Sequence, residues 1–171
     1  MALMHACMHG YAKVIDGHRM PGDTPFIDVV RNGRADTVEA MLIGGVDVNE
    51  LDYEKRSCLH IAAAAGQLAV VELLLQHKSA VNRKDQSGKT PLMNAVAQDH
   101  GAVVKALRKA KAKLDWDESM MANELCDRAH QGKLMAIQML LDCGVNVNSA
   151  DYDRRTALHL AASEGNKRMC Q

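Results

Sequence analysis

Side chains that could bind a metal ion gather near the start of the chain. His5, Cys7 and His9 form a His-x-Cys-x-His run. On a helix, residues 5 and 9 share one face, so both imidazoles could reach one ion. A structural zinc site needs four ligands, and no second pair of ligands follows nearby. We therefore interpret the three residues as helix-surface or packing residues, and we predict no metal site.

A second run imitates the end of a phosphate-binding loop. Ser87, Gly88, Lys89 and Thr90 match the last residues of the P-loop motif, in which backbone amides and a lysine bind phosphate groups. The motif also requires a glycine at position 83, where the chain has Arg83. The sequence therefore predicts no nucleotide site, no other cofactor and no small-molecule substrate.

The histidines and cysteines farther along the chain suggest structural roles. Catalysis by His60 or His159 would need a nucleophile or a carboxylate held opposite, and no such partner is evident. We expect each imidazole to bridge a helix start and the neighbouring loop. Cys126 and Cys143 lie in apolar helical segments, which predicts buried and unreactive thiols. The chain is therefore not expected to be an enzyme.

A basic run is formed by Lys105, Arg108, Lys109, Lys111 and Lys113. One interpretation is structural, because cations stabilise the carboxyl end of a helix. The other is contact with an acidic partner segment or with anionic lipid. The run contains no interleaved aromatic residue, and the chain has equal numbers of basic and acidic residues. Both observations argue against nucleic acid as a partner.

The composition indicates a protein with an aliphatic core in a reducing compartment. Hydrophobic residues make up 47% of the chain but aromatic residues only 3%, so the core must consist of Ala, Leu, Val and Met. No apolar stretch is long enough to span a membrane, and the first residues do not form a secretory signal. The five cysteines are odd in number and lack CxxC spacing, which favours the cytoplasm.

The chain repeats with a period of 33 residues, and three kinds of residue mark the period. The landmarks are Asp52, Asp85 and Asp151; Gly33, Gly66, Gly132 and Gly165; and the pairs at 48–49, 81–82, 114–115 and 147–148. Such a period is typical of stacked units that cannot bury their apolar faces alone. The predicted repeats cover residues 19–51, 52–84, 85–117, 118–150 and a truncated 151–171, after an N-terminal segment, 1–18, that is a possible partial repeat.

Each repeat has the pattern of two antiparallel helices. In the second repeat Ser57 can cap a first helix, and Gly66 can end it. Apolar residues at helical spacing over 70–75 then predict a second helix. The third repeat shows the same pattern, with Pro91 at the first position of its helix.

These repeats resemble ankyrin repeats, which have a T-P-L-H-x-A signature. The matching segments are SCLHIA at 57–62, TPLMNA at 90–95 and TALHLA at 156–161. The resemblance covers residues 19–171 and implies an all-α solenoid of stacked helix-turn-helix units with hairpin-like turn tips. It also implies a non-catalytic scaffold that binds other proteins, such as a peripheral or structural subunit of a larger assembly.

The order of the repeats is similar to that in the ankyrin regions of two further classes of protein. These are plant outward-rectifying shaker-type potassium channels and ankyrin-tailed cytosolic asparaginases, and the segment 151–165 also resembles the ankyrin tail of glutaminases. The sequence contains neither their pore nor their catalytic parts. The alternative hypothesis is therefore a regulatory or assembly module of a longer channel or amidohydrolase chain.

The chain departs from the ankyrin pattern at its turn tips. The tip glycine is present at Gly88, whereas Lys55, Met121 and Arg154 replace it elsewhere. A non-glycine residue there must accept strain or a different geometry. In the fourth repeat we expect a longer first helix and a poorly formed tip around 118–121.

Two further departures fall in the fourth and fifth repeats. Asn123 occupies the threonine position and can still cap, while Cys126 replaces the histidine. In the fifth repeat the second helix is expected to be missing or one turn long. A solenoid needs a polar terminal cap, so we expect either that the sequence is a fragment of a longer chain or that a partner protein covers that end.

The ankyrin resemblance places partner-binding residues on the turn tips and on the inner face of the first helices. By position these are Tyr53, Glu54, Arg56, Gln86, Ser87, Lys89, His130, Tyr152, Asp153, Arg155 and Glu164. The tyrosines and arginines are the first choices, because these residue types dominate interface energetics. Trp116, before the fourth repeat, either packs over the missing tip or anchors a partner.

Overall fold

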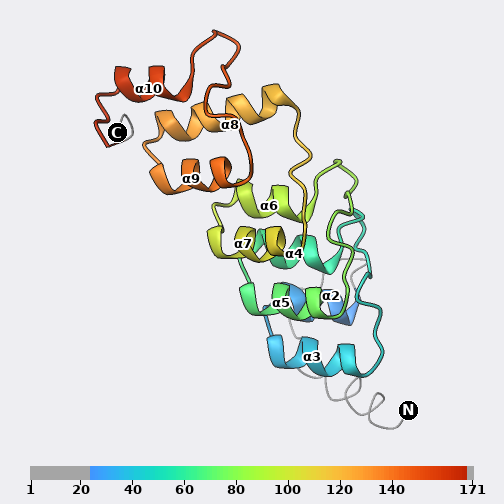
Figure 1. The fold of residues 1–171 in the computed structure, drawn as a ribbon. Coiled ribbons are helices and arrows are strands. Elements are labelled where there is room, and N and C mark those ends of the chain that lie inside the picture. Colours follow the sequence, from blue (N-terminus) through green and yellow to red (C-terminus); the bar gives the residue numbers. More distant parts are fainter. Residues whose placement is uncertain (1–23, 169–171) are drawn as a thin grey trace. The chain divides into compact units, whose positions relative to one another are not determined.

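A computed structural model describes residues 24–168, which form helices and connecting loops (Figure 1). The helices are α2 (Pro25–Arg31), α3 (Ala35–Ile43), α4 (Cys58–Ala64), α5 (Leu68–Gln76), α6 (Pro91–Ala97), α7 (Gly101–Lys109), α8 (Glu118–His130), α9 (Leu134–Asp142) and α10 (Ala157–Ser163). The predicted N-terminal segment, with His5, Cys7 and His9, lies outside the described residues. The chain divides into an N-terminal part that ends at Lys113 and a C-terminal part that begins at Leu114.

The first helix of most repeats begins where the period predicts. Thr24, Ser57, Thr90 and Thr156 are the N-cap residues of α2, α4, α6 and α10, and each has an extended backbone. The hydroxyl of Thr90, for example, accepts a hydrogen bond from the amide of Met93 at 3.4 Å. Such a bond satisfies one of the amides that a helix start leaves without a partner.

In the N-terminal part, first and second helices form two rows (Figure 1). The first helices α2, α4 and α6 pack against one another in that order, and the second helices α3, α5 and α7 do the same. Leu59, Leu74, Leu92 and Leu107 are fully buried between the rows. The predicted aliphatic core is confirmed here, and it results from stacking rather than from any single repeat.

In the C-terminal part, α8 packs against both α9 and α10. Leu125 and Leu140 are fully buried, and Ala129 and Ala161 are nearly so. No further helix follows α10 between Ser163 and Arg168. Within the described residues, the first helix of the fifth repeat is therefore not accompanied by a second helix.

The fourth repeat has the predicted longer first helix but a different cap. Helix α8 has 13 residues, whereas α4 and α6 have 7 each. Asp117 caps it, with a carboxylate oxygen that accepts a hydrogen bond from the amide of Met120 at 2.7 Å. The prediction that Asn123 caps this helix was wrong, because Asp117 starts the helix earlier and places Asn123 inside it. Residues 118–121 belong to the helix and form no turn tip.

Asparagine side chains join each loop to the next repeat in the N-terminal part. The side-chain oxygen of Asn49 accepts a hydrogen bond from the amide of Ala80 at 2.9 Å. Asn82 makes the equivalent bond with the amide of Lys113 at 2.8 Å. The periodic asparagine is thus a contact between repeats, which explains why this landmark keeps the period.

Three of the periodic glycines, Gly33, Gly66 and Gly132, lie beneath a side chain of the following repeat. Gln67 donates to the carbonyl of Arg31 at 3.0 Å, and His100 bonds the carbonyl of Ala64 through Nε2 at 3.1 Å. Gly66 has a φ of +71°, and a Cβ there would lie 2.7 Å from the His100 ring. Glycine is therefore required at position 66 by its backbone conformation and by close packing.

We expect Gly66→Ala to lower the free energy of unfolding by about 2–4 kcal/mol. The left-handed backbone costs about 1 kcal/mol and the overpacking adds the remainder. Gly45→Ala is the control, because Gly45 also has a positive φ of +89° but no atom within 4 Å of an added Cβ. Urea titrations followed by circular dichroism would compare them. Equal losses of unfolding free energy in the two variants would contradict the packing argument. Adding His100→Ala removes the ring, so it should restore part of the stability lost in Gly66→Ala and none of that lost in Gly45→Ala.

Candidate functional site

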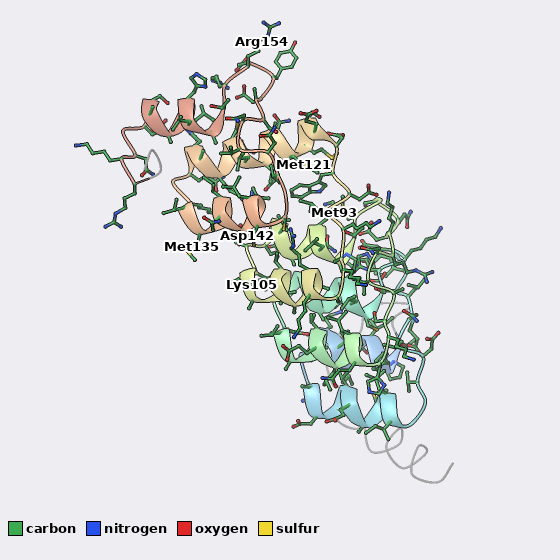
Figure 2. All side chains as sticks on the ribbon, viewed as in Figure 1. Met93, Lys105, Met121, Met135, Asp142 and Arg154 are labelled. Atoms are coloured by element: carbon green, nitrogen blue, oxygen red, sulfur yellow. The ribbon has the colours of Figure 1, made fainter. Side chains whose placement is uncertain are left out.

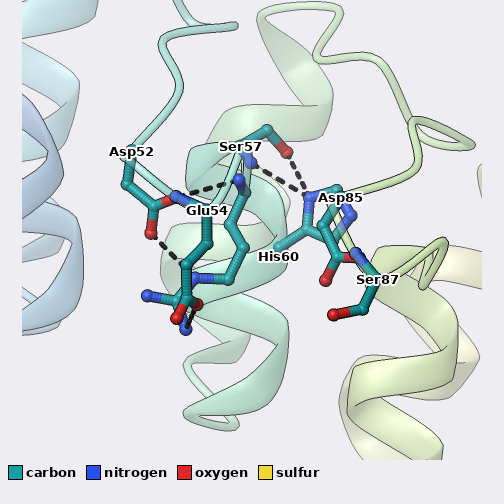
Figure 3. Close-up of polar contacts among 7 residues, drawn as sticks. Asp52, Glu54, Ser57, His60, Asp85 and Ser87 are labelled. Carbon is teal, nitrogen blue, oxygen red and sulfur yellow. Dashed lines mark hydrogen bonds and ion pairs between the residues drawn. The ribbon is translucent and has the colours of Figure 1, made fainter.

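The turn tips are held by the periodic aspartates. One carboxylate oxygen of Asp52 accepts hydrogen bonds from the amides of Glu54 and Arg56, both at 2.9 Å (Figure 3). Asp85 and Asp151 bind the amides two and four residues ahead in the same way, at 2.8–2.9 Å. Each aspartate thus closes its own tip and fixes the backbone that presents the neighbouring side chains.

An arginine completes two of the tips. Arg56 donates from Nε to Asp52 at 2.7 Å and pairs with Glu54 at 2.9 Å. Arg155 is arranged likewise, since it contacts both Asp151 and Asp153. Hydrogen bonds from the backbone amide and the guanidinium of Arg155 lower the pKa of Asp151. Both arginines therefore stabilise the tips from which they would contact a partner.

Two of the three residues that replace the tip glycine adopt its conformation, whereas Met121 lies inside α8. Lys55 has a φ of 57° and Arg154 a φ of 60°, close to the 77° of Gly88. Left-handed backbone is costly for residues with a Cβ, so the prediction of strain at these positions is confirmed. Figure 2 shows Arg154 at the far end of its loop, away from the helices. The aspartate bonds evidently outweigh the strain.

The imidazole of His60 links two repeats, as predicted. Its Nδ1 accepts a hydrogen bond from the amide of Ser57 at 3.1 Å, and its Nε2 donates to the carbonyl of Lys89 at 3.0 Å. The ring is fully buried, and this burial lowers the pKa of His60. A neutral imidazole with the proton on Nε2 fits both contacts.

Cys126 occupies the histidine position of the fourth repeat and keeps one of its contacts. Its thiol donates to the carbonyl of Arg155 at 3.4 Å, which is 29 residues ahead, as Lys89 is from His60. The thiol is buried, and burial raises the pKa of Cys126. Cys143 differs from the prediction, because it is half-buried at the end of α9. Its position after the last helical turn leaves it partly in contact with solvent.

A cleft of 420 Å³ runs along the inner face of the N-terminal part. It gathers four of the predicted residues: Glu54, Arg56, Ser87 and Lys89. Gln86 joins the two tips, because its amide donates to the carbonyl of Glu54 at 3.0 Å. The cleft also contains Arg31 and Asn94, which the sequence analysis missed. The period could have identified Arg31, because it lies 33 residues before Ala64, which also lines the cleft.

A second cleft, of 520 Å³, lies within the C-terminal part. It brings together His130, Tyr152, Asp153 and Arg155 from the predicted set. Glu164 joins them, because its carboxylate lies 3.2 Å from Nδ1 of His130. The missed residues on α8 are Asn123, Cys126 and Asp127. Cys126 and Asp127 lie two periods after His60 and Ile61, which line the first cleft, so the period could have identified them. Trp116 is half-buried and lines neither cleft.

Both clefts are lined by acidic and basic side chains. In residues 24–168, no three His, Cys, Asp or Glu side chains are grouped as a metal site would require. No helix in that range is long and apolar enough to cross a bilayer. The side chains in the clefts can make hydrogen bonds and ion pairs, and they surround small apolar patches such as Ala64 and Ala65.

The sequence matches the profile of ankyrin repeats in three copies over residues 26–116. A second profile, ankyrin repeats in many copies, matches residues 125–171. Among solved structures, the chain is similar to the human ASB11 ankyrin repeat domain with a TM-score of 0.68 and 25% identity. That match covers 86% of this chain and 66% of the other.

Several similar proteins are much longer than this chain. An L-asparaginase from Dirofilaria immitis is 33% identical over 81% of the chain and 23% of its own length. Inversin from Canis lupus familiaris is 31% identical over 94% of the chain and 15% of its length. The Arabidopsis thaliana potassium channel AKT2/3 is 28% identical over 81% of the chain and 17% of its length. The chain thus spans less than a quarter of each.

We expect the stability of the protein to fall as the pH drops below about 6.5, partly through His60. Its pKa is lowered in the folded state, so the unfolded chain binds the extra proton. The contribution is complete above the unfolded pKa and is lost below it, by at most about 1.4 kcal/mol per pH unit. Urea titrations between about pH 7.5 and pH 5 would measure it.

The matched variants are His60→Gln and His77→Gln. His77 is exposed at the end of α5, so its replacement should leave the slope of stability against pH as in the wild type. His60→Gln should flatten the slope, whatever its effect on stability at neutral pH. Identical slopes in both variants would show that His60 does not couple folding to protons.

Proposed function

The chain belongs to the ankyrin-repeat family, and we propose that it is a non-catalytic scaffold that binds other proteins through its turn tips and inner clefts. The supporting observation is the fixed backbone of the tips, where one aspartate accepts two amide hydrogen bonds in each of three loops. A surface that is already ordered loses little conformational entropy on binding. This architecture suits recognition better than chemistry.

Tyr53 and Tyr152 are the proposed anchors. Their side chains are 53% and 99% exposed, although both carry large apolar rings. Tyrosine is enriched among the residues that dominate binding energy. Arg56, whose guanidinium lies 6.0 Å from the centre of the Tyr53 ring, holds the tip and provides charge beside that ring. Trp116 is half-buried before α8, so it either packs over the missing tip or anchors a partner.

We further propose that another helical repeat covers α10. Leu158 is 58% exposed and His159 is exposed, whereas the equivalent Leu59 and His60 are fully buried against the next repeat. Nδ1 of His159 accepts a bond from the amide of Thr156 at 3.0 Å. Its Nε2 has no partner among the described residues, although in His60 the same atom binds a carbonyl. A carbonyl of the covering repeat would complete this contact.

The covering repeat defines two hypotheses for the protein. In the first, a partner protein supplies it, and the chain is a peripheral or structural subunit of an assembly. In the second, the same polypeptide supplies it, and the chain is a regulatory or assembly module of a longer channel or amidohydrolase. The relatives of greater length, which include an L-asparaginase and a potassium channel, favour the second.

We propose a cytoplasmic location and no catalytic role. Cys58 and Cys126 are buried and form no disulfide, and a reducing compartment keeps thiols in that form. Burial raises the pKa of Cys58 to about 12, so this thiol does not act as a nucleophile at neutral pH. The histidines that resemble catalytic groups are used in contacts within and between repeats.

Site-specific photocrosslinking in the native cell tests the proposal. A benzophenone amino acid would replace Tyr53, Tyr152 or Leu158, and Ile43, 74% exposed on α3, would serve as the control position. We expect the two tip positions to capture the same protein and the control to capture none. Tyr53→Ala with Tyr152→Ala should then weaken that complex at least tenfold, by about 1.4 kcal/mol or more.

The outcomes separate the hypotheses. Links from Leu158 to a foreign protein favour a subunit, and links to further sequence of the same polypeptide favour a module. If the tips captured nothing beyond the control position, or if the double variant bound as tightly as the wild type, binding through the tips would be wrong.

A further inference from the structure

Helix α7 separates an apolar side from a basic side. Val103, Val104 and Leu107 are buried against neighbouring helices, while Lys105, Arg108 and Lys109 are exposed. Figure 2 shows Lys105 on the outer surface of this helix. The three cations follow the spacing of one helical face.

The loop after α7 extends the basic face and is held in place. Lys111 and Lys113 are exposed, and Asn82 fixes the backbone of both. Its oxygen accepts from the amide of Lys113 at 2.8 Å, and its nitrogen donates to the carbonyl of Lys111 at 3.4 Å. Arg83, which directly follows Asn82 in the chain, is also exposed. We call Arg83, Lys105, Arg108, Lys109, Lys111 and Lys113 together the basic face.

Stabilisation of the helix end does not account for the basic face. The macrodipole favours cations in the last turn only, which includes Arg108 and Lys109. Lys105 lies farther inside the helix and Lys113 lies beyond it. Like charges four residues apart, as at Lys105 and Lys109, destabilise a helix. No ion pair joins a side chain of the basic face to another described residue, so the charges remain available.

We propose that the basic face binds an acidic segment of a partner protein. Arginine and lysine pair with carboxylates, and a fixed row of cations steers such a segment during association. A membrane is less suitable, because the large exposed apolar residues described in the N-terminal part, Ile43 and Tyr53, lie outside α7 and its loop. Stable membrane attachment needs such a second anchor. The absence of aromatic residues from the basic face disfavours single-stranded nucleic acid.

This surface is distinct from the proposed tip site. Five of the six residues of the basic face lie on α7 and in the loop after it, and Arg83 lies in the loop after α5, whereas the tip residues directly precede the first helices. One partner could bind both the basic face and the tip site. Two linked contacts raise the apparent affinity even when the affinity of each single contact is unchanged. Failure of one proposal leaves the other intact.

Fluorescence anisotropy tests the proposal with a labelled peptide of alternating glutamate and serine at physiological ionic strength. The same peptide with glutamine in place of glutamate is the control ligand. The variant Lys105→Gln/Arg108→Gln/Lys109→Gln removes three exposed charges. Its matched control, Arg34→Gln/Lys167→Gln/Arg168→Gln, removes three exposed charges elsewhere. Circular dichroism would confirm that both variants are folded.

We expect binding of the glutamate peptide to the wild type, at least about a tenfold loss in the basic-face variant and less than about a twofold loss in the control. Equal losses in the two variants, or no binding by the wild type, would overturn the proposal. Tighter binding to phosphatidylserine vesicles or to oligodeoxythymidine, lost in the same basic-face variant, would also overturn it and assign the face to that ligand.

Discussion

Each repeat leaves polar groups and an apolar face that only the next repeat can satisfy, and the structure depends on this constraint. The amide of Ala80 finds its acceptor in Asn49, one repeat earlier, and the carbonyl of Lys89 finds its donor in His60. Leu59 and Leu92 are fully buried because neighbouring first helices cover them. An unpaired buried amide or carbonyl is costly, so stacking specifies the hydrogen bonds as well as the core.

The same constraint explains how the surface is divided between structure and recognition. The side chains that link repeats, such as those of His60 and Asn82, each make hydrogen bonds through two different atoms. Lys89, Lys111 and Lys113 enter these links only through backbone atoms. The side chains of Tyr53, Lys89 and the basic face remain exposed. Side chains at the proposed binding surfaces can therefore vary without disturbing the stack. At α10, which no later described helix covers, residues in the linking positions, such as His159, are exposed.

Much of the fold could be predicted from the sequence, because stacking repeats the same demands every 33 residues. The caps at Ser57 and Thr90 and the bridging role of His60 followed from that period. The cap of α8 did not, since Asp117 lies outside the periodic frame and competes with Asn123. The same period could have identified Arg31 as a cleft residue, but the prediction did not extend to the first repeat. The hydrogen bond from the thiol of Cys126 to the carbonyl of Arg155 could not be predicted from the sequence, because a cysteine at the histidine position does not indicate a donor.

Native-state hydrogen exchange of the N-terminal part tests the central claim most directly. If links between repeats hold the stack together, the amides of Ala80 and Lys113 should exchange only by the cooperative opening that exposes helical amides of α4 and α6. Their opening free energies would then match those of the helices. Much lower opening free energies at these two amides, with the helices still protected, would show that the loops open independently and that the links contribute little.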